Sequence, residues 1–285
     1  MRAPVLVLFV LVAATSAAQD PPSPADPPAA PAADGLRAGK GFIPTRVYSE
    51  AEDQKLLSAF EGLRVADVSD GADAVGLHNV GLMDPEVRPL WKDPKTFRHR
   101  FVGVAVTARY VPTQRPPAGR RPVQEYDDWA GDWYEKLSPE TFDQVLRKGS
   151  ALVIDDAERA DVGSIGSYNI LAWKLRGMVG VVTDASARDL DEIETERVPL
   201  YFRRPGRGIR PGRNELESVN RPVVIGGVLV MPGDVVVADG DGVVVVPRAH
   251  AEEVAGYARR IVEADKAGRR DLYEKAGLPV DKSVE

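Results

Sequence analysis

The strongest constraint on the fold is an alternation of apolar, strand-like runs with helix-like segments in the middle of the chain. Residues 151–155 (ALVID) and 178–183 (MVGVVT) are short apolar runs typical of buried strands. Between them, residues 166–176 (GSYNILAWKLR) have helical spacing, and Gly177 is expected to end that helix. Strands that alternate with helices usually pair in parallel, because each helix returns the chain across the sheet. The sequence therefore predicts an α/β core with parallel strands.

Further segments extend this pattern toward both ends of the chain. Spacing predicts helices over residues 51–63, from 65 onward, over 142–148, 188–196 and 249–269, and strands over 101–111 and 199–202. Residues 221–247 are Val-rich runs broken by Gly-containing turns, of which Asp239 to Gly242 is one. The expected fold class is therefore α/β with a β-rich C-terminal half.

The first 18 residues have the pattern of a secretory signal peptide. Arg2 precedes a short apolar run, and small residues up to Ala18 precede the expected cut. Residues 19–36 are rich in Pro and Ala, which is typical of an extended tether. We therefore expect an exported protein, periplasmic or extracellular, with no membrane association beyond export and with a folded domain over residues 37–285. A buried first strand or helix and an uncleaved anchor are the alternatives.

Residues 112–139 interrupt the alternating pattern. This stretch mixes prolines and arginines with Trp129, Trp133 and Tyr134, and we interpret it as an insertion loop that contains a short helix. One hypothesis is a lid or an oligomer contact. The other is a surface excursion that its tryptophans pin to the domain.

The composition excludes several classes of function. The chain has 43 acidic and 37 basic residues and a net charge of −6, whereas nucleic-acid binding needs a concentrated positive surface. It contains no cysteine, which excludes disulfides, thiolate metal ligands and cysteine nucleophiles. The three histidines, His78, His99 and His250, lack metal-ligand spacing. We therefore expect neither a nucleic-acid partner nor thiol chemistry.

Polar residues follow two of the predicted strands at the point where each strand ends. One strand ends in Asp155-Asp156, and the other leads into Asp184 and then Arg188-Asp189. Ligands bind beyond the carboxyl ends of strands in α/β sheets, and nearby helix starts offer N–H groups to an anion. The sequence therefore predicts a pocket in which an arginine binds a carboxylate or enolate oxygen and carboxylates bind Mg²⁺.

The spacing of Arg188, Asp189 and Glu192 also has a simpler interpretation. Acidic residues at a helix start stabilise the helix dipole, and an exposed arginine beside them forms a surface ion pair. The spacing alone leaves both interpretations open.

Several separated motifs resemble the RraA-like family, which includes class II 4-hydroxy-4-methyl-2-oxoglutarate aldolases and the regulator of ribonuclease E activity. The motifs are VADVSDGADAVG from Val65, LMDPEVRPL from Leu82, GMVGVVTDASARDLDE from Gly177, and VVIGGVLVMPGDVVVADGDGVVVVP from Val223. The resemblance covers most of the chain after the tether, and residues 112–139 lie outside it. It implies a layered β/β/α swivelling-type domain that forms homotrimers or hexamers.

The resemblance also implies roles for individual residues. Asp189 matches the aspartate that binds a divalent metal, with Mg²⁺ expected and Mn²⁺ as the alternative, and Arg188 matches the arginine that binds the pyruvyl group and stabilises its enolate. Gly166 and the N–H groups of Tyr168 and Asn169 match the site for the substrate carboxylate. Two acids complete the implied set: Glu192, which closes the motif, and Glu263, which matches an acid donated by a neighbouring subunit.

One position departs from the family pattern. The aldolases carry an acid directly after the glycine that aligns with Gly166, and this chain has Ser167 there. A hydroxyl can hold a water, but it does not transfer protons near neutral pH. Asp155, Asp156 or Asp184 could replace the acid, and the alternative for Ser167 is a plain helix N-cap.

The function expected from the resemblance is carbon–carbon lyase action on a small 2-oxo acid. Aldol cleavage and decarboxylation of an oxaloacetate-like acid both leave a pyruvate enolate, so the sequence does not choose between them. The alternatives are a non-catalytic binding or regulatory protein, and an enzyme of related fold with chemistry altered by Ser167.

Overall fold

The computed structural model describes residues 33–156 and 161–285, so the expected signal peptide and its cut near Ala18 lie outside the described residues. The chain divides into two compact units, Met1–Phe42 and Ile43–Glu285. In the first unit, α1 (Ala33–Arg37) is a short exposed helix where extended chain was expected. Arg37 Nη1 lies 2.8 Å from Asp34 Oδ1, an i,i+3 pair that stabilises a helical turn.

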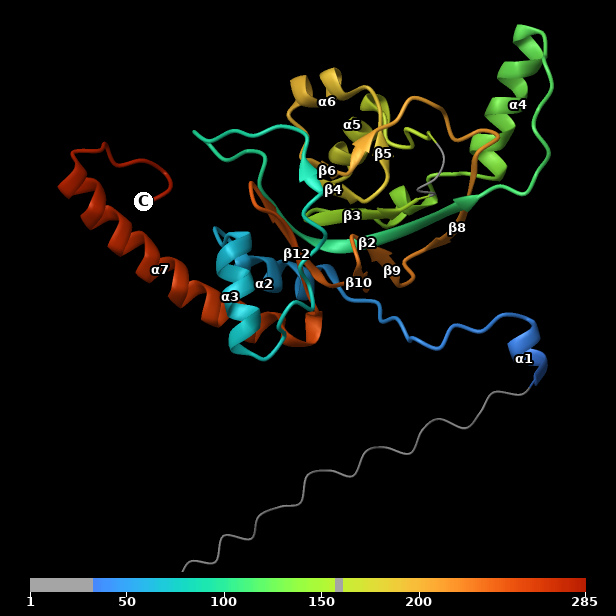
Figure 1. Cartoon of the computed structure of the whole chain (residues 1–285). Helices are drawn as coiled ribbons and strands as arrows, with labels where there is room; N and C mark the ends of the chain where they lie inside the picture. Colours follow the sequence, from blue (N-terminus) through green and yellow to red (C-terminus); the bar gives the residue numbers. More distant parts are fainter. Residues whose placement is uncertain (1–32, 157–160) are drawn as a thin grey trace, which may run out of the picture. The chain divides into compact units, whose positions relative to one another are not determined.

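A mixed sheet forms the centre of the second unit (Figure 1). The parallel strands lie in the order β6, β4, β3, β2, and their bounds are Leu200–Phe202, Met178–Thr183, Ser150–Asp155 and Phe101–Pro112. Antiparallel strands complete the sheet: β1 (Arg88–Pro89) beside β6, and β8 (Asn214–Val219), β11 (Val235–Asp239) and β12 (Gly242–Val246) on the side of β2. The predicted parallel α/β core is confirmed.

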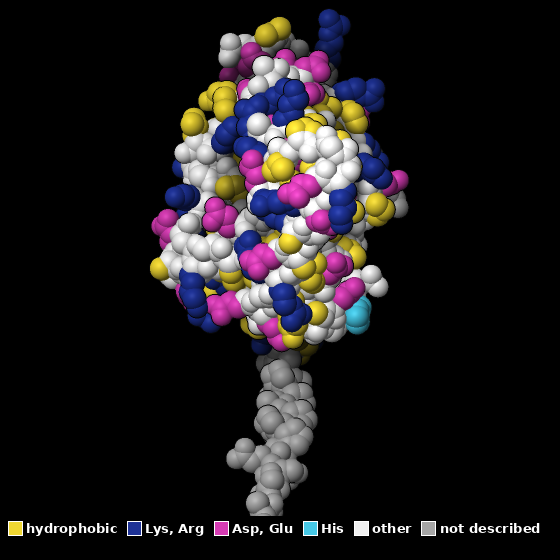
Figure 2. Space-filling model, turned by 90° about the vertical axis from the view of Figure 1, so that its left-hand side faces the viewer, with side chains coloured by type: hydrophobic (Ala, Val, Ile, Leu, Met, Phe, Trp, Pro, Cys, Tyr) yellow, Lys and Arg dark blue, Asp and Glu magenta, His cyan; other side chains and the backbone are white. Residues whose placement is uncertain are grey.

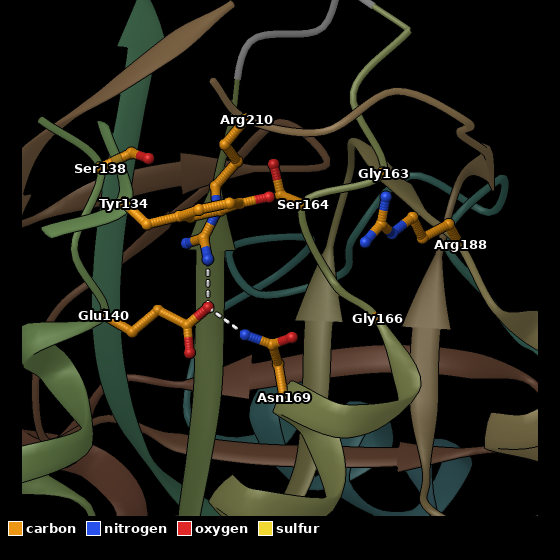
Figure 3. A pocket seen from close by; sticks show the side chains of 9 residues that line it. All are labelled: Tyr134, Ser138, Glu140, Gly163, Ser164, Gly166, Asn169, Arg188 and Arg210. Carbon is orange, nitrogen blue, oxygen red and sulfur yellow. Dashed lines mark hydrogen bonds and ion pairs between the residues drawn. The ribbon is translucent and has the colours of Figure 1, made fainter. Parts of the chain in front are cut away.

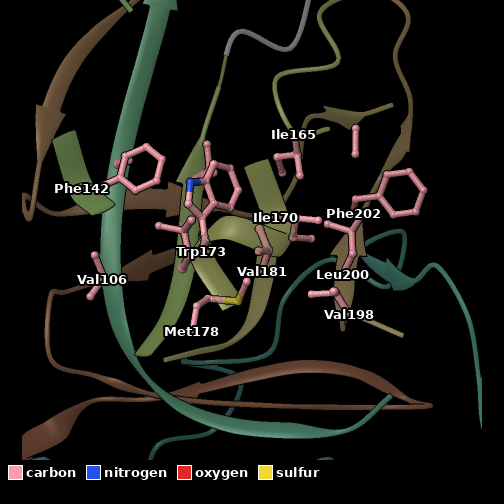
Figure 4. Close-up of a cluster of buried hydrophobic side chains, with 14 of the residues drawn as sticks. Val106, Phe142, Ile165, Ile170, Trp173, Met178, Val181, Val198, Leu200 and Phe202 are labelled. Atoms are coloured by element: carbon pink, nitrogen blue, oxygen red, sulfur yellow. The ribbon is translucent and has the colours of Figure 1, made fainter. Parts of the chain in front are cut away.

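The two faces of the parallel strands are covered differently. Leu152 and Ile154 of β3 pack with Ile170 and Trp173 of α5 (Ser167–Leu175), in a cluster that α6 (Leu190–Glu196) also joins (Figure 4). Val153 of β3 faces the opposite side, because successive side chains in a strand point to opposite faces. There it packs under a hairpin formed by β9 (Val223–Ile225) and β10 (Val228–Val230). Hairpin, sheet and helices form the expected β/β/α layers.

A second group of helices covers the antiparallel strands. Val235 and Val237 of β11 face α2 (Glu50–Phe60), α3 (Val65–Ala74) and α7 (Ala251–Ala276). Gly71 lets α3 and α7 approach closely, because a Cβ at this position would lie 2.7 Å from the carbonyl oxygen of Val254. All three helices were expected from their spacing, and α7 continues past the predicted end near residue 269.

Two segments differ from their predicted structure. Residues 142–148 were expected to form an α-helix, but they contain only a 3₁₀ turn, η1 (Thr141–Val145). The chain turns sharply toward β3 here, and Ser150 Oγ accepts a hydrogen bond of 2.9 Å from the N–H of Arg147. The insertion contains a longer helix than expected, α4 (Val123–Lys136), which lies beside the end of β8 that begins with Asn214 (Figure 1).

The surface is polar and mixed in charge. On the face drawn in Figure 2, Lys and Arg side chains are interspersed with Asp and Glu. No helix within residues 33–156 and 161–285 combines the length and the apolar character needed to cross a membrane.

Candidate functional site

Two short strands hold the segment that carries Arg188 and Asp189. After β4, residues Ser186–Ala187 form β5, which pairs in parallel with β7 (Arg204–Pro205). The N–H of Arg188 then donates a 2.8 Å hydrogen bond to the carbonyl of Ile165. This bond places the residue pair directly beside the loop that leads into α5.

Asp189 lies at the start of two helices. It is the N-cap residue of α6, with φ 56° and ψ 42°, a left-handed conformation that aspartate tolerates better than most residues. Its Oδ2 accepts a 3.2 Å hydrogen bond from the N–H of Ser167, the first residue of α5. Its Oδ1 lies 3.8 Å from Arg188 Nε. The structure therefore brings together Asp189, which is the predicted metal ligand, Arg188 and the predicted anion-binding start of α5.

Two glycines make this close approach sterically allowed. A Cβ on Gly166 would lie 2.7 Å from Asp189 Oδ2, and a Cβ on Gly163 would lie 2.7 Å from the Cβ of Arg188. Any side chain at either position would displace the charged residue beside it. The loop before α5 therefore positions both Arg188 and Asp189.

A cavity of about 420 Å³ opens beside this arrangement (Figure 3). The loop before α5, α5 itself and the segment after β5 contribute Gly163, Ser164, Gly166, Asn169 and Arg188 to its lining. The remaining lining residues were missed by sequence reasoning: Tyr134, Ser138, Glu140 and Arg210. Tyr134 and Ser138 belong to the insertion, so residues 112–139 form one wall of the cavity.

Arg210 and the partly exposed Glu140 form an ion pair at the inner end of the cavity. Arg210 is 4% exposed, its Nη2 bonds to Glu140 Oε1, and its Nη1 donates to the hydroxyl of Tyr110 at 2.7 Å. Its guanidinium carbon lies 5.2 Å from the ring centre of Tyr134, which lies across it in Figure 3. Glu140 also accepts hydrogen bonds from Asn169 Nδ2 and, at 3.0 Å, from Trp173 Nε1. The pair therefore links the insertion to α5.

Burial raises the pKa of Tyr134, although the charge of Arg210 opposes the shift. The hydroxyl of Tyr134 therefore stays protonated and neutral at physiological pH. It can donate or accept a hydrogen bond in the cavity.

The remaining predicted residues lie away from the cavity. The side chain of Tyr168 is 85% exposed, but its N–H belongs to the first turn of α5, before the first intrahelical bond from Ile170 to Gly166. Asp184 is buried, and its Oδ2 accepts a 3.0 Å bond from the N–H of Gly226. Glu192 lies exposed on α6 and Glu263 lies exposed on α7. None of these side chains lines the cavity.

The other two candidate acids at the strand ends have partners of their own. Asp155 Oδ2 lies 3.3 Å from Arg109 Nε, and burial, aided by the charges of Asp184 and Asp156, raises the pKa of Asp155 to about 6. Asp156 is buried and accepts hydrogen bonds from Ser164 Oγ and, at 2.6 Å, from Asn214 Nδ2. Neither side chain reaches the cavity.

The predicted metal ion can be tested against the donor atoms present. Within the described residues, no group of three or more His, Asp or Glu side chains converges to hold a metal. Asp189 is 39% exposed; its Oδ2 accepts the bond from Ser167, and its Oδ1 lies 3.8 Å from Arg188 Nε, beyond hydrogen-bond distance. Mg²⁺ in proteins often uses one or two carboxylates and keeps several waters, so this donor set fits Mg²⁺ held by one side chain.

Sequence and structure comparisons identify the relatives of the chain. The family model RraA-like (Aldolase/RraA) matches residues 65–245, which is more than half of the chain. The chain is 26% identical over 220 residues to protein DlpA of Legionella pneumophila, a match that covers 75% of this chain and 32% of that protein.

A second relative, from Halalkalibacterium halodurans, is named "Putative 4-hydroxy-4-methyl-2-oxoglutarate aldolase". It is 30% identical over 127 residues, which cover 44% of this chain and 60% of that protein. The chain thus spans less than two thirds of either relative.

A solved structure shows the same fold. It is RraAS2 of Streptomyces coelicolor, described as an unusual member of the RNase ES inhibitor RraA protein family, and it superposes with a TM-score of 0.60 at 22% identity. The match covers 79% of this chain and 99% of that one. The family match over more than half of the chain, together with the shared layered fold, shows that the chain belongs to the RraA-like family.

Proposed function

We propose that the protein is a divalent-metal-dependent carbon–carbon lyase that acts on a 2-oxo acid through a pyruvate enolate. The observation that carries the proposal is that Arg188 and the first turn of α5 line one cavity, while Asp189 contacts both of them directly behind it. The aldolase name of the Halalkalibacterium relative supports the same reaction class.

Each residue of this group has a distinct task in the proposed reaction. The free N–H groups of the first turn of α5, including those of Tyr168 and Asn169, bind the carboxylate of the 2-oxo acid. The Arg188 guanidinium binds the keto oxygen and stabilises the negative charge that develops there as the enolate forms. Asp189 would hold the divalent ion, which supplies Lewis-acid polarisation of that keto group.

Because residue 167 is a serine, another group must transfer the proton in the proposed reaction. Ser167 is half-buried at the start of α5 and offers a hydroxyl that can orient a water. Asp155, Asp156 and Asp184 do not line the cavity. We infer that a water held near Ser167, together with an acid from a second subunit, moves the proton. Glu263 on α7 is the candidate for that acid.

The test is deuterium exchange at the methyl group of pyruvate, followed by NMR. Exchange requires enolate formation but no particular leaving group, so it covers aldol cleavage and decarboxylation together. We expect exchange with Mg²⁺ and its loss with a chelator. Arg188→Lys and Asp189→Asn should each lower the rate at least about 100-fold. The first replaces the planar guanidinium fork that binds the enolate by a point charge, and the second removes the carboxylate that would hold the metal.

Asp191→Asn is the matched control, because Asp191 is an exposed acid on the same helix, two residues from Asp189. It should leave the exchange rate unchanged. An unaltered rate in Asp189→Asn would remove the metal site from the mechanism. No exchange by the folded wild-type protein would favour the alternative, a binding or regulatory role.

A further inference from the structure

The two ends of the cavity differ in how their arginines are paired. At the outer end, Arg188 Nε is 3.8 Å from Asp189 Oδ1, which is beyond hydrogen-bond distance, and the side chain is 35% exposed. At the inner end, Arg210 is almost fully buried and its charge is matched by Glu140 in direct contact. The outer arginine is thus available to an anionic group of a ligand, whereas the inner arginine already has its counter-ion.

The inner end also presents a hydroxyl without a partner. Ser138 is fully buried and lines the cavity, and its Oγ has no hydrogen-bond partner among the described residues. Buried hydroxyls in native proteins are nearly always hydrogen-bonded, so an unpartnered one at a cavity wall points to a ligand. In Figure 3 the neutral hydroxyl of Tyr134 lies beside Ser164, on the side of the ring away from Ser138, and all three residues line the cavity.

Building on the proposed lyase function, we propose that the protein selects 2-oxo acids whose tail ends in an uncharged hydroxyl group rather than in a second carboxylate. Ser138 and Tyr134, both supplied by the insertion, are the specificity-determining residues. The carboxylate and keto group bind at Arg188 and α5, and the tail extends toward Arg210.

Charge pairing explains the selectivity. A tail carboxylate at the inner end would have to share Arg210 with Glu140 in a buried environment, and a buried anion without its own cation is strongly disfavoured. A tail hydroxyl needs only one hydrogen bond, which Ser138 Oγ can provide.

The reaction on such a substrate needs no further reactant. In a 4-hydroxy-2-oxo acid the C3–C4 bond breaks and its electron pair forms the pyruvate enolate. The C4 hydroxyl loses its proton as C4 becomes an aldehyde, and a proton added at C3 completes pyruvate. No oxidant or reductant is required.

Calorimetric titration with two unreactive ligands tests the selectivity separately from catalysis. The ligands are 5-hydroxy-2-oxopentanoate and 2-oxoglutarate, which have the same carbon chain and differ at the tail. Both lack the C4 hydroxyl, so neither is cleaved. In the presence of Mg²⁺ we expect the hydroxyl ligand to bind about 10-fold more tightly.

Three variants locate the selectivity. Ser138→Ala and Tyr134→Phe should each weaken the hydroxyl ligand about 3- to 10-fold and change 2-oxoglutarate binding little. Glu140→Gln should reverse the preference, because Arg210 then lacks its counter-ion and can pair with a tail carboxylate. Tyr126→Phe on the exposed side of α4 is the control and should alter neither affinity.

The outcomes are separable. Equal or tighter binding of 2-oxoglutarate by the wild type, no detectable binding of either ligand, or an unchanged ratio in Ser138→Ala would overturn the selectivity. Circular dichroism checks that Glu140→Gln is folded. If it is not folded, the ratio of the two affinities in Ser138→Ala decides whether the proposed selectivity holds. If the preference holds but pyruvate shows no deuterium exchange, the lyase function is wrong and the tail selectivity stands.

Discussion

Asp189 combines a strained backbone with a charged, half-exposed side chain. Non-glycine residues in the left-handed region concentrate at functional sites, and here the conformation turns the carboxylate back toward the N–H of Ser167. The Arg-Asp pair can be singled out from the sequence by the family motif that it resembles, whereas its spacing after a strand leaves a surface ion pair open. Arg210 could not, since it is one of several arginines in the stretch 203–221 and nothing in its spacing distinguishes it.

Replacing Gly166 with alanine should damage the site without unfolding the protein. The new Cβ would lie 2.7 Å from Asp189 Oδ2 and push the carboxylate away from α5. We expect a loss of about 10- to 100-fold in Mg²⁺ affinity and in pyruvate exchange, as is usual when the support of a metal ligand is disturbed. Titration calorimetry and the exchange assay measure both.

Gly131→Ala is the control for this substitution, because a Cβ at Gly131 on α4 would meet no atom within 4 Å. It should leave exchange unchanged and raise the free energy of unfolding by about 0.5–1 kcal/mol. Wild-type Mg²⁺ affinity in Gly166→Ala would show that Asp189 is not held from this side.

Asp155 predicts a pH dependence of stability. Its pKa is raised to about 6, mainly by burial, against a reference value of 3.8. Because its pKa is higher in the native state, Asp155 holds its proton more tightly there than in the unfolded chain. The stability that the neutral carboxyl contributes is therefore fully present below the unfolded pKa and is lost as pH rises through about 6.

Asp155→Asn should therefore become more stable relative to the wild type between about pH 4 and about pH 8, as measured by urea unfolding. Asp127→Asn, which changes an exposed acid on α4, should show a constant difference. A constant difference for Asp155→Asn as well would contradict the shift.

At the scale of elements, the parts that could be predicted are those fixed by hydrophobic period. The bounds of β2, β3, β4 and α5 agree almost to the residue with those predicted. In the strands every second residue is apolar or the whole run is, in the helix every third or fourth residue is, and these side chains face the hydrophobic cores of the structure. Residues 142–148 show the limit of this reasoning. Although their spacing is helical, these residues form a sharp turn before β3, made by η1 and by the hydrogen bond to Ser150. Only tertiary contacts decide such short segments.

The insertion shows why its two hypotheses could not be separated from the sequence. Trp133 is 5% exposed, and its Nε1 donates a 2.9 Å bond to the carbonyl of Asn214, so a tryptophan does pin α4 to the domain. The next residue, Tyr134, lines the cavity. The same helix therefore docks on the domain and forms a wall of the site, and only the docked position reveals the second role.

Trp133→Ala should cost about 3–5 kcal/mol in free energy of unfolding, because it removes a large buried side chain and leaves the carbonyl of Asn214 unpaired. It should also raise the KM for 2-oxo acids, since α4 carries Tyr134. Trp129→Ala, which removes a less buried ring from the same helix, should cost clearly less. Similar costs for the two variants, measured by urea unfolding, would contradict this docking.

For the whole molecule, we propose a homotrimer or a pair of trimers in which each site receives Glu263 from a neighbouring chain. Light scattering after size-exclusion chromatography should give three or six times the chain mass. Exposure of Glu263 on α7, away from its own cavity, is consistent with donation to another subunit.

Complementation between inactive variants tests this shared site. Arg188→Lys and Glu263→Gln should each be impaired, and co-expression should restore activity to about one quarter of wild type, because random assembly leaves that fraction of sites intact. No recovery, with both variants present in the same oligomers, would place the acid elsewhere.

Export remains a proposal at this scale as well, because residues 1–32 lie outside the described residues. Mass spectrometry of the protein recovered from a bacterial host should find a chain that begins near Gln19. A full-length chain that begins at Met1 would contradict cleavage.

The origin of the cavity walls has a practical consequence. The loop before α5 and the Arg188-Asp189 pair lie in the segment between β3 and α6, whereas Tyr134 and Ser138 are carried by the segment between β2 and η1. In the proposed reaction, the residues that form the enolate and those that recognise the tail are thus carried by separate stretches of sequence. Grafting a different helix between residues 112 and 139 should retune which tails are accepted while the enolate-forming half is left untouched.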